Sequence, residues 1–197
     1  MAIQLNGQEI GPIKFTDDKP GKTIHVGPLA PSNPIDGDVW IDSDQLNNAG
    51  KNLLQTIDLS TGGSSKTLTI STDYKDICVV VRELNISSNA TLFFRLNNDV
   101  THYIDGANQT ATELFNITAI KSGVSTNNLQ FMIYDIKDTN SYTWGKVEGV
   151  YTSSSTNTPI FTNAYGCYTQ PNAITSASIS IGVSTFISGT ILVYGVN

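Results

Sequence analysis

The sequence is poor in charged residues, and the charge it carries is mostly acidic. Charged side chains make up 14% of the 197 residues, against roughly 25% in an average soluble protein. The net charge is −6 at pH 7, and no run of lysine or arginine occurs. Because nucleic acids and anionic membrane surfaces are bound mainly through Lys and Arg, we expect neither as a partner.

Long apolar stretches are also missing. No segment of the sequence approaches the roughly 18 apolar residues of a membrane span. Residues 1–6 lack both the basic start and the apolar stretch of a secretory signal. We therefore expect no membrane insertion, and synthesis and folding in a cytosol.

Cysteine is scarce, with only Cys78 and Cys167 in the chain. Cys78 lies in the apolar run "ICVVV", and neither cysteine belongs to a C-x-x-C pair. In a cytosol such residues are expected to be buried thiols, although a disulfide between them stays open.

The sequence is rich in uncharged polar residues, with 19 Ser, 23 Thr and 18 Asn. These residues suit the outer faces of strands and the turns between them better than they suit helices. Apolar segments recur between turn signals every eight to twelve residues or so, a pattern typical of sandwiches and barrels. The expected strands cover residues 53–59, 66–70, 76–84, 90–96, 114–120, 129–136, 177–183 and 189–196. The one helical candidate, residues 44–55, is interrupted by Gly50.

Alternation assigns faces to three of these strands. Apolar residues at every second position should point into the core, because successive side chains of a strand point to opposite faces. The expected inward sets are Leu68 and Ile70; Phe115, Ile117 and Ala119; and Ala177, Ile179, Ile181 and Val183. The fold class predicted is all-β, an antiparallel jelly-roll-like β-sandwich.

Proline divides the chain into two zones. Five of the seven prolines lie before residue 35, at Pro12, Pro20, Pro28, Pro31 and Pro34. Because proline fixes φ and lacks a backbone donor, this zone is predicted to be an extended arm with short strands at most. The expected organisation is an N-terminal anchoring or connector segment, residues 1–50, followed by a β-sandwich domain, residues 51–197.

The stretch "PSNPIDGDVWIDSD" concentrates carboxylates. If it is extended, Asp36, Asp38, Asp42 and Asp44 share one face with Trp40, and calcium is the cation that such a face could hold. The spacing fails that of an EF-hand loop, so these four residues are weak metal candidates. The alternative interpretation is a structural connector, in which Val39, Trp40 and Ile41 are candidates for contact with another subunit.

Catalytic signatures are not visible. His25 and His102 each stand alone in the sequence, without a nucleophile elbow or a zinc-binding spacing nearby. The sequence therefore predicts a protein that is not an enzyme and uses no cofactor.

Several aromatic residues lie in polar surroundings, and three of them are candidates for contact with glycans: Tyr103, Tyr142 and Trp144. Aromatic rings can stack on sugars while nearby Asn and Asp bind the hydroxyls. The alternative is that these rings pack inward on strand faces.

Two segments resemble those of tailed-bacteriophage appendage proteins. "APSNPIDGDVWIDSD" is similar to a P-x-N-P-x-x-G-D-V-W-x-D segment of fibre proteins, and "FISGTILVYGVN" is similar to the last strand of many phage β-sandwich proteins. The matching positions are Pro31, Asn33, Pro34, Gly37, Asp38, Trp40 and Asp42, and then Phe186, Ser188, Gly189, Thr190, Tyr194 and Gly195. "DYKDICVVVREL" with "TLFFRLNND" also resembles a strand pair of that sandwich.

The resemblance implies a structural virion protein: a tail, collar or head fibre, an adaptor or a capsid decoration. It implies a homotrimer, contacts with other virion proteins and localisation in the virion after synthesis in the host cytoplasm. A carbohydrate-binding module at a virion tip, which recognises a host surface glycan, is the alternative function.

Overall fold

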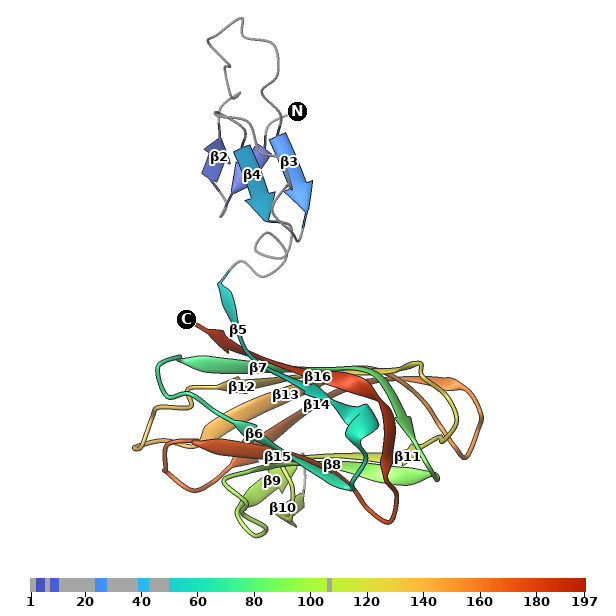
Figure 1. Ribbon diagram of the computed structural model, residues 1–197. Helices are drawn as coiled ribbons and strands as arrows, with labels where there is room; N and C mark the ends of the chain where they lie inside the picture. Colours follow the sequence, from blue (N-terminus) through green and yellow to red (C-terminus); the bar gives the residue numbers. More distant parts are fainter. Residues whose placement is uncertain (1–2, 6–7, 11–23, 28–38, 43–49, 106–107) are drawn as a thin grey trace, which may run out of the picture. The chain divides into compact units, whose positions relative to one another are not determined.

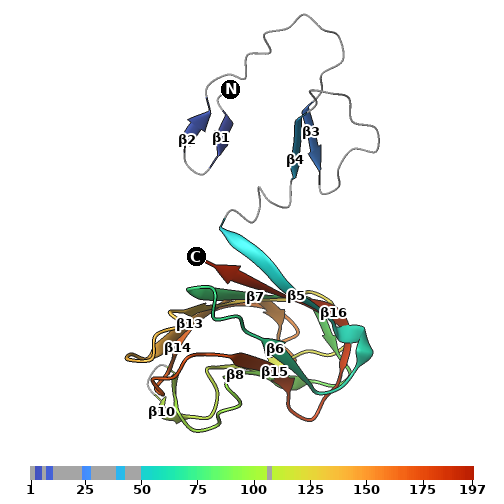
Figure 2. The same cartoon turned by 60° about the vertical axis from the view of Figure 1, so that its left-hand side comes forward.

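The computed structural model describes residues 3–5, 8–10, 24–27, 39–42, 50–105 and 108–197. The chain divides into two units, Met1–Gly50 and Lys51–Asn197 (Figure 1). The larger unit is a two-layered all-β structure, and Figure 2 shows its layers from a second direction.

The described part of the first unit consists of two short strand pairs. β1 (Ile3–Leu5) and β2 (Gln8–Ile10) are antiparallel. β3 (Ile24–Gly27) and β4 (Val39–Asp42) are parallel, with His25 opposite Trp40. The five prolines of the expected arm all lie outside the described residues.

The second unit is built from two sheets, with one short 3-10 helix, η1 (Leu59–Thr61), after the first strand. The strands of the large sheet are β5 (Lys51–Asp58), β7 (Asp76–Ile86), β9 (Tyr103–Asp105), β10 (Asn108–Ala111), β12 (Asn127–Tyr134), β13 (Thr143–Thr152), β14 (Pro159–Tyr168) and β16 (Phe186–Val196). The strands of the small sheet are β6 (Ser65–Thr69), β8 (Ala90–Leu96), β11 (Phe115–Ile120) and β15 (Ser176–Ile181).

The strand order is that of a jelly roll with an extended sheet. The large sheet runs β10-β9-β14-β13-β12-β7-β16-β5 and the small sheet runs β11-β8-β15-β6. The chain crosses between the sheets after β5, β6, β7, β8, β10, β11 and β15, and after the β13–β14 hairpin has extended the large sheet. All strand pairs in this unit are antiparallel. The predicted antiparallel jelly-roll-like β-sandwich is therefore confirmed.

Three phenylalanines join the two sheets. Phe94 on β8 and Phe115 on β11 come from the small sheet, and Phe131 on β12 comes from the large one. The rings of Phe94 and Phe131 are stacked with centroids 4.6 Å apart, and Phe115 lies 5.7 Å from Phe131. All three side chains are buried, and burial of each contributes about 1.5–3 kcal/mol.

Two of the expected inward residues face elsewhere. Val183 is 95% exposed because β15 ends at Ile181, so Val183 lies in the turn before β16. Ala119 has φ of 57° at a bulge in β11, and Ile120 takes the buried position instead. Both predictions assumed that the alternation of the strand continues without interruption.

Four strands of the second unit were not predicted. β9 and β10 are short, and β13 and β14 have few apolar residues at consecutive inward positions. On β13 and β14 the inward positions include Gly145 and Gly166, which lie opposite each other. A Cβ at Gly145 would lie 2.9 Å from side-chain atoms of Leu114 and Phe115, so these two residues fill the space.

The turn between β8 and β9 is fixed by a buried tyrosine and a carboxylate. The Tyr103 hydroxyl donates to the Leu96 carbonyl at 3.0 Å and accepts from the Leu96 N–H at 2.8 Å, which ties β9 to the end of β8. Asp99 accepts hydrogen bonds from the Thr101 N–H and hydroxyl, and from Tyr168 on β14. Its Oδ2 also lies 2.7 Å from His102 Nδ1.

This set of contacts shifts the protonation of Asp99. Burial alone would raise the pKa of Asp99, but the hydrogen bonds from Thr101, His102 and Tyr168 outweigh it and lower that pKa to about 2. In an unfolded chain the pKa of Asp is about 3.9. The folded state therefore binds fewer protons than the unfolded state in this range, so the contribution of Asp99 to stability is present above about pH 4 and is lost as pH falls toward 2.

We predict that Asp99→Asn lowers the free energy of unfolding at neutral pH and weakens its dependence on pH between about 4 and 2. Urea unfolding at several pH values measures both effects. Glu83→Gln, which neutralises an exposed carboxylate on β7, is the control and should keep the wild-type pH dependence. Parallel curves for wild type and Asp99→Asn would contradict the assignment.

Candidate functional site

One side of the large sheet faces away from the small sheet, and we call it the outer face. Its side chains alternate with the buried ones along each strand. On the five strands from β16 to β14 the outer-face residues are Thr190, Leu192, Tyr194 and Val196; Asp76, Cys78, Val80 and Arg82; Asn128, Gln130, Met132 and Tyr134; Trp144, Lys146, Glu148, Val150 and Thr152; and Pro159, Phe161, Asn163, Tyr165 and Cys167.

The outer face is unusually apolar for a surface that no described element of this unit covers. Only Asp76, Arg82, Lys146 and Glu148 among its residues are charged, and they carry no net charge, although the whole chain carries −6. The corresponding face of the small sheet is largely polar, with Thr67, Thr91, Ser178, Ser180 and Asn116 on it. A contiguous apolar surface of this kind is more typical of an interaction site than of a face exposed to water.

Four aromatic residues gather at one end of the outer face, and we call them the aromatic patch. They are Tyr134, Tyr142, Trp144 and Tyr165. Trp144 lies opposite Tyr134 on one neighbouring strand and opposite Cys167 on the other, with Tyr165 two residues from Cys167. Trp144 is 57% exposed and Tyr165 is 60% exposed. Tyr142, half-exposed, lies in the turn that precedes β13.

A shallow groove crosses the same face toward the opposite ends of these strands. It consists of two adjoining depressions, with volumes of about 270 Å³ and 480 Å³, that share Asn128, Glu148 and Gly149. The first is also lined by Val80 and Arg82, and the second by Val150, Phe161, Thr162 and Asn163. We call this feature the groove.

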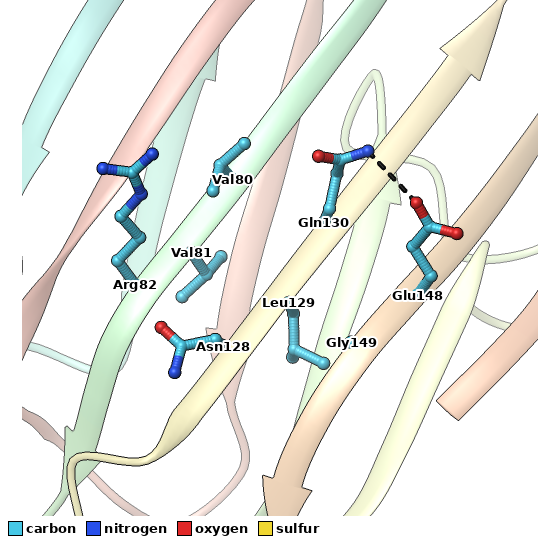
Figure 3. A pocket seen from close by; sticks show the side chains of 8 residues that line it. All are labelled: Val80, Val81, Arg82, Asn128, Leu129, Gln130, Glu148 and Gly149. Carbon is cyan, nitrogen blue, oxygen red and sulfur yellow. Dashed lines mark hydrogen bonds between the residues drawn. The ribbon is translucent and has the colours of Figure 1, made fainter. Parts of the chain in front are cut away.

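Polar side chains stand along the groove (Figure 3). Gln130 Nε2 donates to Glu148 Oε1 at 3.3 Å, and Lys146 Nζ donates to Glu148 Oε2 at 2.5 Å. Asn128 accepts from the Glu83 N–H and donates to the Thr126 carbonyl, so its orientation is fixed. The Lys146–Glu148 hydrogen bond also raises the pKa of Lys146. Lys146 therefore keeps its charge at neutral pH.

The structure separates the three candidates for glycan contact. Tyr142 and Trp144 lie on the surface in the aromatic patch. Tyr103 does not: it is 1% exposed, and its hydroxyl is bonded to the backbone of Leu96. Its ring packs against Tyr168 with centroids 5.2 Å apart, so the prediction for Tyr103 was wrong.

The acidic stretch is only partly described. Asp36, Asp38 and Asp44 lie outside the described residues, and Asp42 is the last residue of β4. Val39, Trp40 and Ile41 precede it on the same strand, paired with Ile24, His25 and Val26 of β3. Within the described part of the chain, no group of three or more His, Cys, Asp or Glu residues could hold a metal ion.

The pair of Asp99 and His102 has part of the geometry of a catalytic triad. In such a triad the carboxylate binds one ring nitrogen of the histidine and the nucleophile binds the other. Here Asp99 Oδ2 and Thr101 Oγ1 both lie near Nδ1 of His102, at 2.7 and 2.9 Å. The hydroxyl and the carboxylate thus lie at the same ring nitrogen. This arrangement stabilises the turn and does not reproduce the geometry of a triad.

Sequence reasoning missed the groove and most of the outer face. Phe161 and Arg82 were not singled out, and Phe161 is 85% exposed. The signal available was the alternation Phe161, Asn163, Tyr165 and Cys167 in residues 159–168, which places all four side chains on one face. It shows as a pattern only once that segment is taken as a strand.

The chain matches no protein-family model and no curated protein. Among the residues that the structure describes, no helix has the length and apolar character needed to cross a membrane.

Both cysteines are free thiols that lie on the outer-face side of their strands and are covered by their neighbours. Cys78 is 0% exposed and Cys167 is 2% exposed. Burial raises the pKa of both thiols, and at Cys78 this outweighs the opposing effect of Lys51, whose Nζ lies 3.6 Å from the sulfur.

We predict that neither thiol reacts readily with Ellman's reagent in the native protein at about pH 8, because the thiolate is disfavoured and the sulfur is covered. Both should react after unfolding in denaturant. The absorbance of the released thionitrobenzoate measures this. Rapid release of two equivalents from native protein would contradict the burial of these residues.

Proposed function

We propose that this protein is a non-enzymatic structural component of a bacteriophage virion that works through protein–protein contacts. The observation that carries the proposal is the apolar outer face with its aromatic patch. Large aromatic residues dominate the binding energy of protein interfaces. The resemblance of two segments to phage appendage proteins supports the same function.

A second copy of this chain is the partner that we assign to the aromatic patch. Two molecules that each carry a charge of −6 repel each other, so they should meet where acidic residues are fewest. The outer face meets that condition because its two acidic residues, Asp76 and Glu148, are balanced by two basic ones, Arg82 and Lys146. The resemblance to phage fibres sets the proposed number of copies at three.

The aromatic patch suits such a contact for a second reason. Trp144, Tyr134 and Tyr165 extend from neighbouring strands of one sheet, which fixes their positions before a partner arrives. Tyr and Trp lose little conformational entropy on binding, since each has two side-chain torsions. Binding to a preformed aromatic surface therefore costs less side-chain conformational entropy.

Residues 1–50 form the second contact in this proposal, as the segment that anchors the protein in the virion. Val39, Trp40 and Ile41 on β4 are the proposed contacts with a neighbouring virion protein. The separation of the chain into units at Gly50 suits a division between attachment and display.

We predict that the wild-type protein, 21.2 kDa per chain, forms a trimer at micromolar concentration and that Trp144→Ala weakens it. Loss of a central aromatic contact costs about 2 kcal/mol or more, which raises the dissociation constant on the order of thirtyfold. Size-exclusion chromatography with light scattering, run over a dilution series, measures the change. Since Trp144 is largely exposed, its removal should leave the fold intact.

Val183→Ala is the matched control, because Val183 is an exposed apolar residue in a turn and not on the outer face. It should keep the wild-type oligomeric state. A wild-type protein that stays monomeric at micromolar concentration would contradict the proposed self-association.

The virion assignment has its own test. Antibody raised against the sandwich unit should label one defined position on purified phage particles in electron micrographs. The protein should also be found by mass spectrometry of those particles. A protein found in infected cells but missing from purified particles would overturn the structural function.

A further inference from the structure

We propose that the groove is a binding site for an oligosaccharide, which would give this protein a recognition function in addition to its structural one. The ligand class is a short, hydroxyl-rich saccharide of a cell-surface polymer. The proposal depends on the residues of the groove and not on the aromatic patch, so it stands or falls separately from the proposed trimer.

The first argument is the combination of an apolar floor with a polar rim. The floor consists of apolar atoms of Val80, Val150 and Phe161, with Gly149 at the centre. Sugar rings carry C–H groups on their faces and hydroxyls at their edges. A sugar ring lying flat in the groove would place its C–H groups against the apolar floor and its hydroxyls against the polar rim.

The second argument is the position of Phe161. It is 85% exposed at one end of the groove, on the outer-face side of β14. An isolated apolar residue on a surface needs no explanation, but here the ring borders a depression and stands beside Asn163, two residues along the same strand. Phe161 thus offers a ring on which a saccharide can stack, and Asn163 offers an amide that can bind its hydroxyls.

The third argument is the row of hydrogen-bonding groups across three strands. Gln130 lies opposite Glu148, and Glu148 lies opposite Asn163, so the three side chains extend from neighbouring strands in one line. Amides donate and accept, and the carboxylate accepts, which matches hydroxyl groups that do both. Strands are about 4.8 Å apart, so the row spans about 10 Å.

Gly149 shapes the centre of the groove. It has φ of 150°, and a Cβ built there would lie 2.2 Å from the Asn128 carbonyl oxygen. No other residue type fits this position without movement of the backbone. The site is thus formed in the protein before any ligand binds, which keeps the cost of ordering low.

An extended peptide is a poorer occupant. Peptides that bind along sheets do so by pairing with the free N–H and C=O groups of an edge strand. The groove crosses β7, β12 and β13, which are paired on both sides, and ends on β14, whose residues 159–165 pair with β13 alone among the described strands. A peptide paired with that free edge would lie beside the sheet and not in the groove, where only side chains are available to a ligand.

The test is an array of purified bacterial surface oligosaccharides, from lipopolysaccharide, capsule and teichoic acid, probed with the full-length protein. We expect wild type to bind at least one class, with Phe161→Ala lowering the affinity for it on the order of tenfold. Asn163→Ala should lower the affinity severalfold. Both side chains are exposed, so neither variant should alter the fold, which circular dichroism and thermal unfolding check.

Two controls separate this site from the others. Val183→Ala should bind as wild type does. Trp144→Ala should weaken the trimer while each chain keeps its affinity for a soluble hit measured by calorimetry. Wild type that binds no oligosaccharide on the array overturns the proposal, as does full affinity in Phe161→Ala. Loss of binding in Trp144→Ala alone would place saccharide stacking in the aromatic patch and would overturn the assignment to the groove.

Discussion

The contact between Phe94, Phe115 and Phe131 is the interaction on which the rest of the sandwich depends. It places the small sheet over one side of the large sheet's central strands. Once that side is covered, the alternation of each strand decides what the opposite side displays. The buried Leu129, Phe131 and Ile133 thus determine that Asn128, Gln130, Met132 and Tyr134 face outward on β12.

The β13–β14 hairpin depends on the same contact in a different way. Gly145 and Gly166 lie opposite each other at the place where Leu114 and Phe115 approach from the start of β11. A Cβ at Gly166 would lie 2.3 Å from the Leu114 carbonyl oxygen. Leu114 can therefore pack against β14 only where that strand has a glycine. The hairpin is held as an extension of the sheet by apolar groups that belong to another strand. Its outward side chains, Trp144 and Phe161 among them, are therefore carried on a rigid support.

This arrangement explains how much the sequence could predict. Strands such as β7, β8, β12 and β16 carry their own apolar residues, so their positions follow from composition and alternation alone. β13 and β14 bury glycines under residues distant in the sequence, and no local pattern reveals that. Tyr103 illustrates the same limit: its polar neighbours predicted a surface position, whereas Leu96 and Tyr168 enclose it through the fold.

The site was predictable to a smaller extent than the fold. Trp144 and Tyr142 could be named because aromatic residues in a polar segment stand out in a sequence. The groove could not be named, since Val80, Gln130, Glu148 and Phe161 come from four strands and meet only through the strand order. A surface assembled across a sheet becomes visible once the register is known.

The two ends of the outer face can serve different partners at the same time. Trp144 and Val150 are six residues apart on β13, which corresponds to about 20 Å at about 3.3 Å per residue. A contact centred on the aromatic patch would therefore leave the end of the groove at Val150 and Phe161 open to a small ligand. Conversely, a ligand held by Phe161 and Asn163 would not displace a partner bound at Trp144. Assembly and recognition then place no conflicting demands on the sequence, because each uses its own end of one rigid sheet.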